Sequence, residues 1–128
     1  MALGWQPVIG VLVALAGAGG AVARFGLDGA MKWRWPTTFP WATFLINVTG
    51  SLLLGFLTGL VLFHDAPDDL KLIAGTGFCG GYTTFSTASF EAIRLLQQRH
   101  LWTAALAAAG TLFLTMGAAA LGLVLAKL

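Results

Sequence analysis

Residues 75–90 read GTGFCGGYTTFSTASF, a run rich in small and hydroxyl side chains within an otherwise strongly apolar chain. Four glycines fall within residues 75–81, and five serines and threonines fall within residues 83–89. Glycine costs about 1 kcal/mol relative to alanine inside a helix, so this composition disfavours a continuous helix. We predict that a helix breaks here and that its hydroxyl groups line a polar cavity. Close helix packing on the glycines is the alternative interpretation.

The composition of the whole chain is that of a membrane protein. The chain has 128 residues, of which 58% are hydrophobic and only 9% are charged, against roughly 25% charged residues in soluble domains. Its formal net charge is +2. These values exclude a soluble globule, a disordered chain and a nucleic-acid-binding protein. The single cysteine, Cys79, excludes a disulfide within the chain.

Long stretches without charged residues predict the membrane-spanning helices. A helix needs about 20 apolar residues to cross the hydrocarbon layer. We predict an all-α membrane protein with a single four-helix domain over residues 1–128. The expected helices lie near residues 8–23, 41–63, 72–90 and 101–126, and the third of these contains the predicted break. Broken backbone at membrane depth is tolerated only where it is buried in protein or lines a cavity.

Basic residues indicate an orientation. The first and third loops and their flanks carry five of them: Arg24, Lys32, Arg34, Arg94 and Arg99. The opposite side carries two, Lys71 and Lys127. The positive-inside rule then places the first and third loops in the cytoplasm, although a difference of this size specifies orientation only weakly.

Four polar residues outside the broken stretch are candidate functional positions. Asn47 lies in the middle of the second span, where its amide must find hydrogen-bond partners, and its two N–H donors suit an anion. Thr111 and Thr115 are four residues apart and share a helical face. Arg24 ends the first predicted span. Snorkelling to the interface, attraction of an anion to a vestibule and a structural anchor remain open for Arg24.

The available chemistry favours a pore for a small anion. Glu91 is the only acid at membrane depth and ends its span, so neither an enzyme nor a small four-helix multidrug exporter with a buried acid is expected. A non-conducting subunit would explain the glycines but not the hydroxyl run together with Asn47. The hydroxyls of Ser86 and Thr87 can replace water around an ion, and Phe85 can offer its positive ring edge.

The chain resembles the Fluc (CrcB-type) fluoride channel family over essentially its whole length. Residues 76–87 read TGFCGGYTTFST and are similar to the family signature Thr-Gly-Phe-x-Gly-Gly-x-Thr-Thr-Phe-Ser-Thr. Arg24, within Ala-Arg-Phe, resembles the arginine at the end of the family's first helix. Asn47, within Ile-Asn-Val-Thr-Gly, matches the asparagine of its second helix.

The resemblance implies an antiparallel, dual-topology dimer in the bacterial inner (plasma) membrane, with two pores that passively export fluoride and lower its toxicity. It also implies a structural sodium ion, not transported, at the centre of the dimer interface. The sodium would be held by the backbone carbonyls of Gly80 and Thr83. Phe85 matches the first of two phenylalanines whose edges face fluoride, and Thr111 and Thr115 fall where the family places hydroxyls on its fourth helix.

Two positions depart from the family pattern. Ala88 stands where the family usually has the second phenylalanine, and Ala107 occupies a position that is aromatic in some members. These departures and the charge bias suggest a second possibility, in which the chain is one subunit of a heterodimeric channel with a degenerate pore. The expected partners are therefore fluoride, the lipid bilayer, and either a second copy of the chain or a paralogous subunit.

Overall fold

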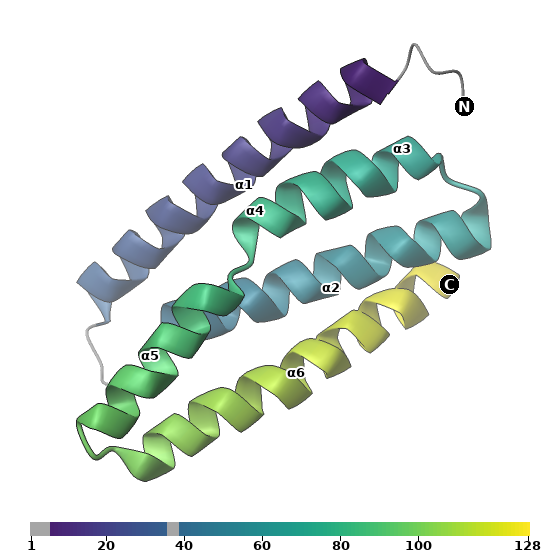
Figure 1. The fold of residues 1–128 in the computed structure, drawn as a ribbon. Helices are drawn as coiled ribbons and strands as arrows, with labels where there is room; N and C mark the ends of the chain where they lie inside the picture. Colours follow the sequence, from purple (N-terminus) through teal and green to yellow (C-terminus); the bar gives the residue numbers. More distant parts are fainter. Residues whose placement is uncertain (1–5, 36–38) are drawn as a thin grey trace.

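A computed structural model describes residues 6–35 and 39–128. The described residues form helices and short connections, with no strand among them. The elements, labelled in part in Figure 1, are α1 (Gln6–Arg34), α2 (Trp41–His64), α3 (Asp68–Leu70), η2 (Lys71–Cys79), α4 (Gly80–Tyr82), α5 (Phe85–Gln97) and α6 (Leu101–Lys127). The element η2 is a π-helix, a wide form that is rare and frequent at functional sites.

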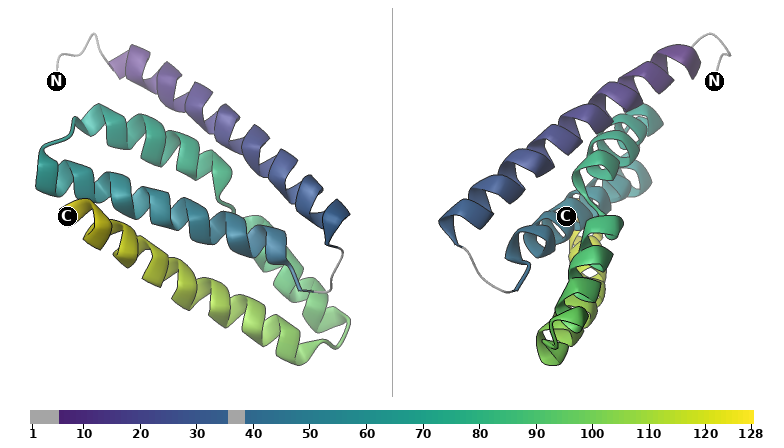
Figure 2. Two further views of the ribbon diagram at one scale, coloured as in Figure 1. Left: turned by 180° about the vertical axis from the view of Figure 1, so that it is seen from behind. Right: turned by 60° about the vertical axis from the view of Figure 1, so that its left-hand side comes forward.

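The chain passes back and forth along the bundle four times (Figures 1 and 2). The third pass consists of α3, η2, α4 and α5, whereas each of the other passes is a single helix. The outer passes are α1 and α6, with η2 and α2 between them (Figure 2). The start of α1, residues 65–67 and the end of α6 lie at one end of the bundle, which we call the terminal end (Figure 1). The end formed by Arg34, Trp41 and residues 98–100 is called the loop end.

Among the residues that the structure describes, three helices are long and apolar enough to cross a membrane: Pro7–Arg34, Trp41–His64 and Leu101–Lys127. The predicted second and fourth helices agree with α2 and α6 to within one residue at each end. The third pass is interrupted as predicted and runs from Asp68 to Gln97, longer than the expected 72–90.

The prediction for the first helix was wrong, because α1 continues to Arg34, eleven residues beyond the expected end at residue 23. The prediction ended the helix where its apolar residues end. The additional residues include charged side chains, which a helix can continue through. Lys32 Nζ and Asp28 Oδ2, one helical turn apart, form an ion pair of 3.2 Å. Arg24 therefore lies inside α1 and not at its end.

Glycines let α1 pack directly on the backbone of the third pass. A Cβ atom on Gly20 would lie 2.1 Å from the carbonyl oxygen of Phe78. On the other side of the contact, a Cβ on Gly81 would lie 2.0 Å from the carbonyl oxygen of Gly17. Small residues are typical of membrane helix contacts, because close packing replaces the missing hydrophobic drive. Close packing therefore accounts for Gly81, beside the predicted break.

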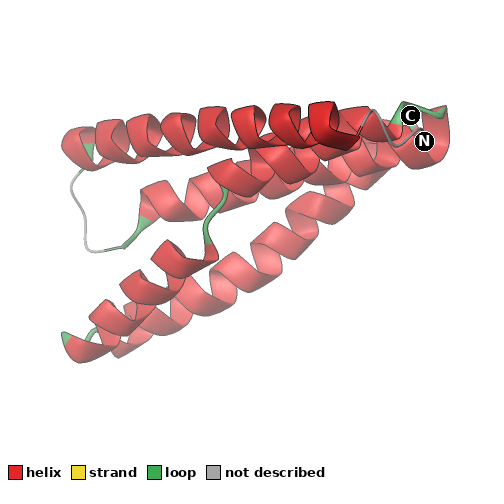
Figure 3. Cartoon of the chain, turned by 45° about the horizontal axis from the view of Figure 1, so that its top comes forward, coloured by secondary structure: helices red, strands yellow, loops and turns green. Residues whose placement is uncertain are grey.

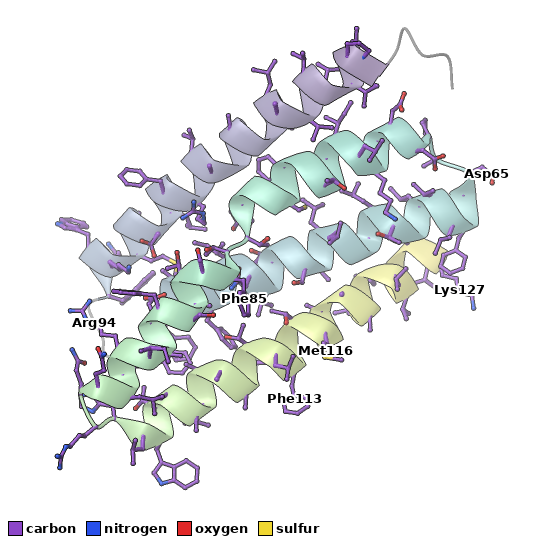
Figure 4. The ribbon with its side chains drawn as sticks, viewed as in Figure 1. Asp65, Phe85, Arg94, Phe113, Met116 and Lys127 are labelled. Carbon is purple, nitrogen blue, oxygen red and sulfur yellow. The ribbon has the colours of Figure 1, made fainter. Side chains whose placement is uncertain are left out.

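The contact between α2 and α6 uses the same device. A Cβ on Gly55 would lie 2.1 Å from the carbonyl oxygen of Ala119, and one on Gly122 would lie 2.3 Å from that of Leu52. Large apolar side chains instead point away from the bundle, as Phe113 does on α6 (Figure 4). Such an outward-facing apolar surface suits lipid.

Gly20→Ala should lower the free energy of unfolding in detergent by about 1–3 kcal/mol, because its methyl group overpacks against the Phe78 carbonyl. Gly19→Ala is the matched control, since a Cβ there meets no atom within 4 Å. Both changes raise helix propensity equally. Thermal unfolding followed by circular dichroism measures the difference, and equal stabilities of the two variants would contradict the close contact.

Candidate functional site

The break between α4 and α5 consists of two extended residues, Thr83 (φ −81°, ψ 158°) and Thr84 (φ −148°, ψ 118°). Figure 3 shows it as a short loop between two helices of the third pass. Thr83 donates from both its backbone N–H and its hydroxyl to the carbonyl of Cys79, each at 2.8 Å. The Thr84 hydroxyl oxygen accepts from the Thr87 amide at 3.1 Å. Thr84 is therefore the N-cap of α5.

Asn47 on α2 holds the break in this conformation. Its Nδ2 donates to the carbonyl oxygen of Thr84 at 3.0 Å, and its Oδ1 accepts from the Thr84 amide at 2.8 Å. The side chain is only 7% exposed. The side-chain amide of Asn47 thus takes the place of the helical hydrogen-bond partners that Thr84 lacks. The same two bonds satisfy the polar groups of this buried asparagine. Its second N–H has no partner among the described residues and remains free for another acceptor.

The break leaves the carbonyls around the end of α4 without their helical donors, and those of Gly80 and Thr83 are two of them. In a continuous helix the Thr84 amide would bond to the Gly80 carbonyl, but it donates to Asn47 instead. Likewise, the Thr87 amide donates to the Thr84 hydroxyl and not to the Thr83 carbonyl. The carbonyls of Gly80 and Thr83, predicted from the resemblance as sodium ligands, are therefore without their helical donors. Gly80 also faces open space, since a Cβ there would meet no atom within 4 Å.

Arg24 contacts the end of the first half-helix. Its Nε donates to the carbonyl oxygen of Gly81 at 3.4 Å. A cation at a helix C-terminus is favourable because unpaired carbonyls and the helix dipole make that end negative. Of the three alternatives for Arg24, this contact favours the structural anchor.

A cavity of about 440 Å³ lies beside the break. No carboxylate, ammonium or guanidinium group is among its described lining residues. It brings together seven of the ten predicted site residues, from α2, the third pass and α6: Asn47, Gly80, Thr83, Phe85, Ala88, Thr111 and Thr115. Ala88 lies one turn beyond Phe85 and lines the same cavity. The cavity wall therefore has a methyl group, and no aromatic ring, at this position.

Phe85 lines this cavity and is 86% exposed, and Figure 4 shows it at the start of α5. The two threonines of α6 are not equivalent. The Thr115 hydroxyl donates to the carbonyls of its own helix at Thr111 and Leu112. The Thr111 hydroxyl has no hydrogen bond among the described residues. The Thr111 hydroxyl is therefore free to donate a hydrogen bond to an anion. The Thr115 hydroxyl proton is already engaged, so Thr115 offers only its oxygen, as an acceptor.

Three predicted residues do not line the cavity: Arg24, Ser86 and Thr87. The Ser86 hydroxyl lies 3.4 Å from the Thr84 hydroxyl at the start of α5. Thr87 contributes its backbone amide to the cap. Ala107 is buried against Leu95, in a small cluster near the loop end.

A second polar contact joins α2 and α5, and it was not predicted from the sequence. The Thr43 hydroxyl donates a short hydrogen bond to Oε1 of Glu91, and Thr43 is 3% exposed. Thr43 and Asn47 are one helical turn apart, so spacing alone placed them on one face of α2. A second cavity, of about 930 Å³, lies at this loop end, and its lining includes Glu91, Lys32 and Arg94.

Known proteins similar to the chain include named ion channels. A family model described as "CrcB-like protein, Camphor Resistance (CrcB)" matches residues 11–123. The chain is 55% identical over 117 residues to the fluoride-specific ion channel FluC 1 of Leifsonia xyli subsp. xyli, and the matched region covers 91% of this chain and 85% of the relative. It is 40% identical over 122 residues to FluC 1 of Frankia casuarinae, with 91% and 95% covered. It is 39% identical over 120 residues to FluC of Thermococcus onnurineus, with 93% and 96% covered.

Asn47→Leu should loosen the break, because it leaves the part-buried amide and carbonyl of Thr84 without the Asn47 partner, at a cost of about 1–3 kcal/mol. Asn47→Asp keeps the acceptor for the Thr84 amide. It loses the donor to the Thr84 carbonyl. Hydrogen–deuterium exchange of a peptide covering residues 80–90 should therefore speed up most in the leucine variant, which keeps neither bond, and less in the aspartate variant. Unchanged exchange in the leucine variant would show that Asn47 does not hold the break.

Proposed function

The chain belongs to the CrcB family of fluoride channels, which are not enzymes, and we propose that it is itself a fluoride-selective channel. It is a multi-pass membrane protein. The observation that carries the proposal is the cavity beside the break, in which neutral donors from three passes converge without a carboxylate among the described lining residues. Such a lining suits a small, strongly hydrated anion.

Three kinds of donor can replace the water around fluoride in this cavity. Asn47 has a free amide N–H, and Thr111 has a free hydroxyl. The first amide of α5, at Phe85, has no helical acceptor and lies at the positive end of a half-helix, and Phe85 lines the cavity. The exposed ring of Phe85 adds a positive edge. Narrow geometry and these donors supply selectivity without a fixed positive charge.

Export needs no energy source. Hydrogen fluoride enters a cell as a neutral weak acid and ionises inside, which traps fluoride. A negative interior drives the anion outward by about 2.3 kcal/mol per 100 mV. The channel would therefore lower cytoplasmic fluoride passively from the inner membrane of a bacterial-type cell.

The proposed assembly is an antiparallel dimer. In a single chain Phe85 and Gly80, both on the cavity wall, face open space, so a second subunit would cover them. The freed carbonyls of Gly80 and Thr83 fit a hard cation such as sodium, because carbonyl oxygens replace the hydration shell of such ions. One chain supplies two of about six oxygen ligands, so a site shared between two chains is more complete. When bound, the sodium supplies a fixed positive charge at the interface.

A second candidate is one subunit of a heterodimeric channel. The loop end carries four basic residues, Lys32, Arg34, Arg94 and Arg99, whereas the terminal end carries Lys71 and Lys127. Such a bias favours one fixed orientation, and an antiparallel partner would then be a different chain. Ala88 on the cavity wall supports the same reading, because one pore would lack an aromatic edge.

Liposomes that contain only the purified chain should lose fluoride rapidly and retain chloride, as measured with ion-selective electrodes. Asn47→Asp should reduce fluoride flux at least about a hundredfold. Two like charges about 4 Å apart repel by about 4 kcal/mol at an effective dielectric constant of 20. This variant keeps only one of the two bonds to Thr84, so hydrogen–deuterium exchange over residues 80–90 separates electrostatic repulsion from a loosened break.

Absence of flux from the chain alone, with flux restored by a co-reconstituted paralogue, would favour the heterodimer. Absence of fluoride flux in both preparations would overturn the channel proposal.

Replacing sodium by N-methyl-D-glucamine during purification should lower the thermal unfolding midpoint of the dimer, and adding sodium back should restore it. A ligand at one hundred times its dissociation constant stabilises by about 2.7 kcal/mol. Potassium at the same concentration is the control for ionic strength. Equal midpoints in all three salts would contradict a structural sodium.

A further inference from the structure

A chain of polar contacts joins α1, α5 and α2 at the loop end. Lys32 Nζ lies 3.2 Å from Asp28 Oδ2 and 3.8 Å from Glu91 Oε2. The other carboxylate oxygen of Glu91 accepts the hydrogen bond from Thr43. The Glu91 side chain is 17% exposed, and the Lys32 side chain is 55% exposed. One lysine on the outer pass thus neutralises an acid that is largely enclosed.

Glu91 occupies a critical place for an anion channel. Thr43 and Asn47 are one turn apart on α2, and they meet the third pass at Glu91 and at the break, respectively. Glu91 lines the larger cavity and Asn47 lines the smaller one, and we call the row Asn47, Thr43 and Glu91 the polar seam. An anion that leaves the break along this seam toward the loop end passes the Glu91 carboxylate. An unmasked negative charge at that point would repel it.

The charged residues around the larger cavity nearly cancel. Its described lining contains two permanent cations, Lys32 and Arg94, and one acid, Glu91, so the lining is net positive by one charge. Arg94 has no ion pair among the described residues, whereas Lys32 lies against the acid. Removing the lysine charge makes the lining neutral and leaves the carboxylate with only the Thr43 hydroxyl.

We propose that Lys32 is a positioning residue of the channel, which masks the Glu91 carboxylate and holds it against Thr43 so that the loop-end cavity admits an anion. This inference rests on the proposed fluoride channel and adds a residue to it. Asp28 holds Lys32 from the other side, through a contact within α1.

The test is fluoride flux in liposomes for the full chain, in the assembly that conducts. Lys32→Gln should lower flux roughly tenfold, at the low end of the effect of charge focusing in clefts. Lys32→Arg should retain flux, because it keeps the charge. The double variant Lys32→Gln, Glu91→Gln restores the net charge of the lining and should return flux to within about twofold of wild type. Lys71→Gln removes a lysine at the terminal end and should leave flux unchanged.

Rescue by the double variant distinguishes neutralisation of the Glu91 charge from a purely structural contact between α1 and α5. If Lys32 only joined α1 to α5, the contact would be absent in both glutamine variants and the second substitution would restore nothing. Full flux in Lys32→Gln, or no rescue in the double variant, would overturn the proposal while the wild-type chain still conducts. Absence of flux in the wild type would overturn the proposed function itself. Size-exclusion chromatography of each variant shows whether the assembly is intact.

Discussion

The pairing of Asn47 with both backbone groups of Thr84 is the interaction on which the rest of the site depends. Inside a membrane, an interrupted helix cannot satisfy its free N–H and C=O groups with water. The Asn47 amide supplies one acceptor and one donor at that point. Because the Thr84 amide is engaged there, the Gly80 carbonyl is released and α5 begins with a free amide. The freed carbonyls and the free amide at the start of α5 follow from this pair, and α6 adds Thr111 to the same cavity.

The outer pass supports the same break from the opposite side. Glycine contacts bring the α1 backbone against η2 and α4, and Arg24 then reaches the carbonyl of Gly81. A bulky residue at Gly20 would move α1 away and withdraw this cation from the helix end. Beyond the break, α1 continues to Lys32, which reaches Glu91. The helix α1 therefore brings one cation to the break and another to Glu91.

Much of the fold could be predicted from the sequence, because hydropathy reports directly on which segments enter lipid. The bounds of α2 and α6 were correct to within a residue. The end of α1 was wrong, since charged residues at one-turn spacing pair with each other and prolong a helix beyond its apolar part. Of the predicted site residues, Thr111 and Ala88 line the cavity, whereas Ser86 does not. Residue type indicates hydrogen-bonding capacity, but the rotation of α5 decides which hydroxyl faces the cavity.

By itself, the sequence determined that the chain is a membrane protein with an interrupted third pass. Apolar length, glycine content and hydroxyl content are local properties that need no knowledge of neighbours. Only the tertiary structure decided what satisfies the interruption and what neutralises the nearby acid. The bonds from Asn47 to Thr84 and from Arg24 to Gly81 join residues 37 and 57 positions apart. Such contacts depend on how closely α2 and α1 pack against the third pass, and this closeness is set by glycine contacts between helices that no local pattern pairs.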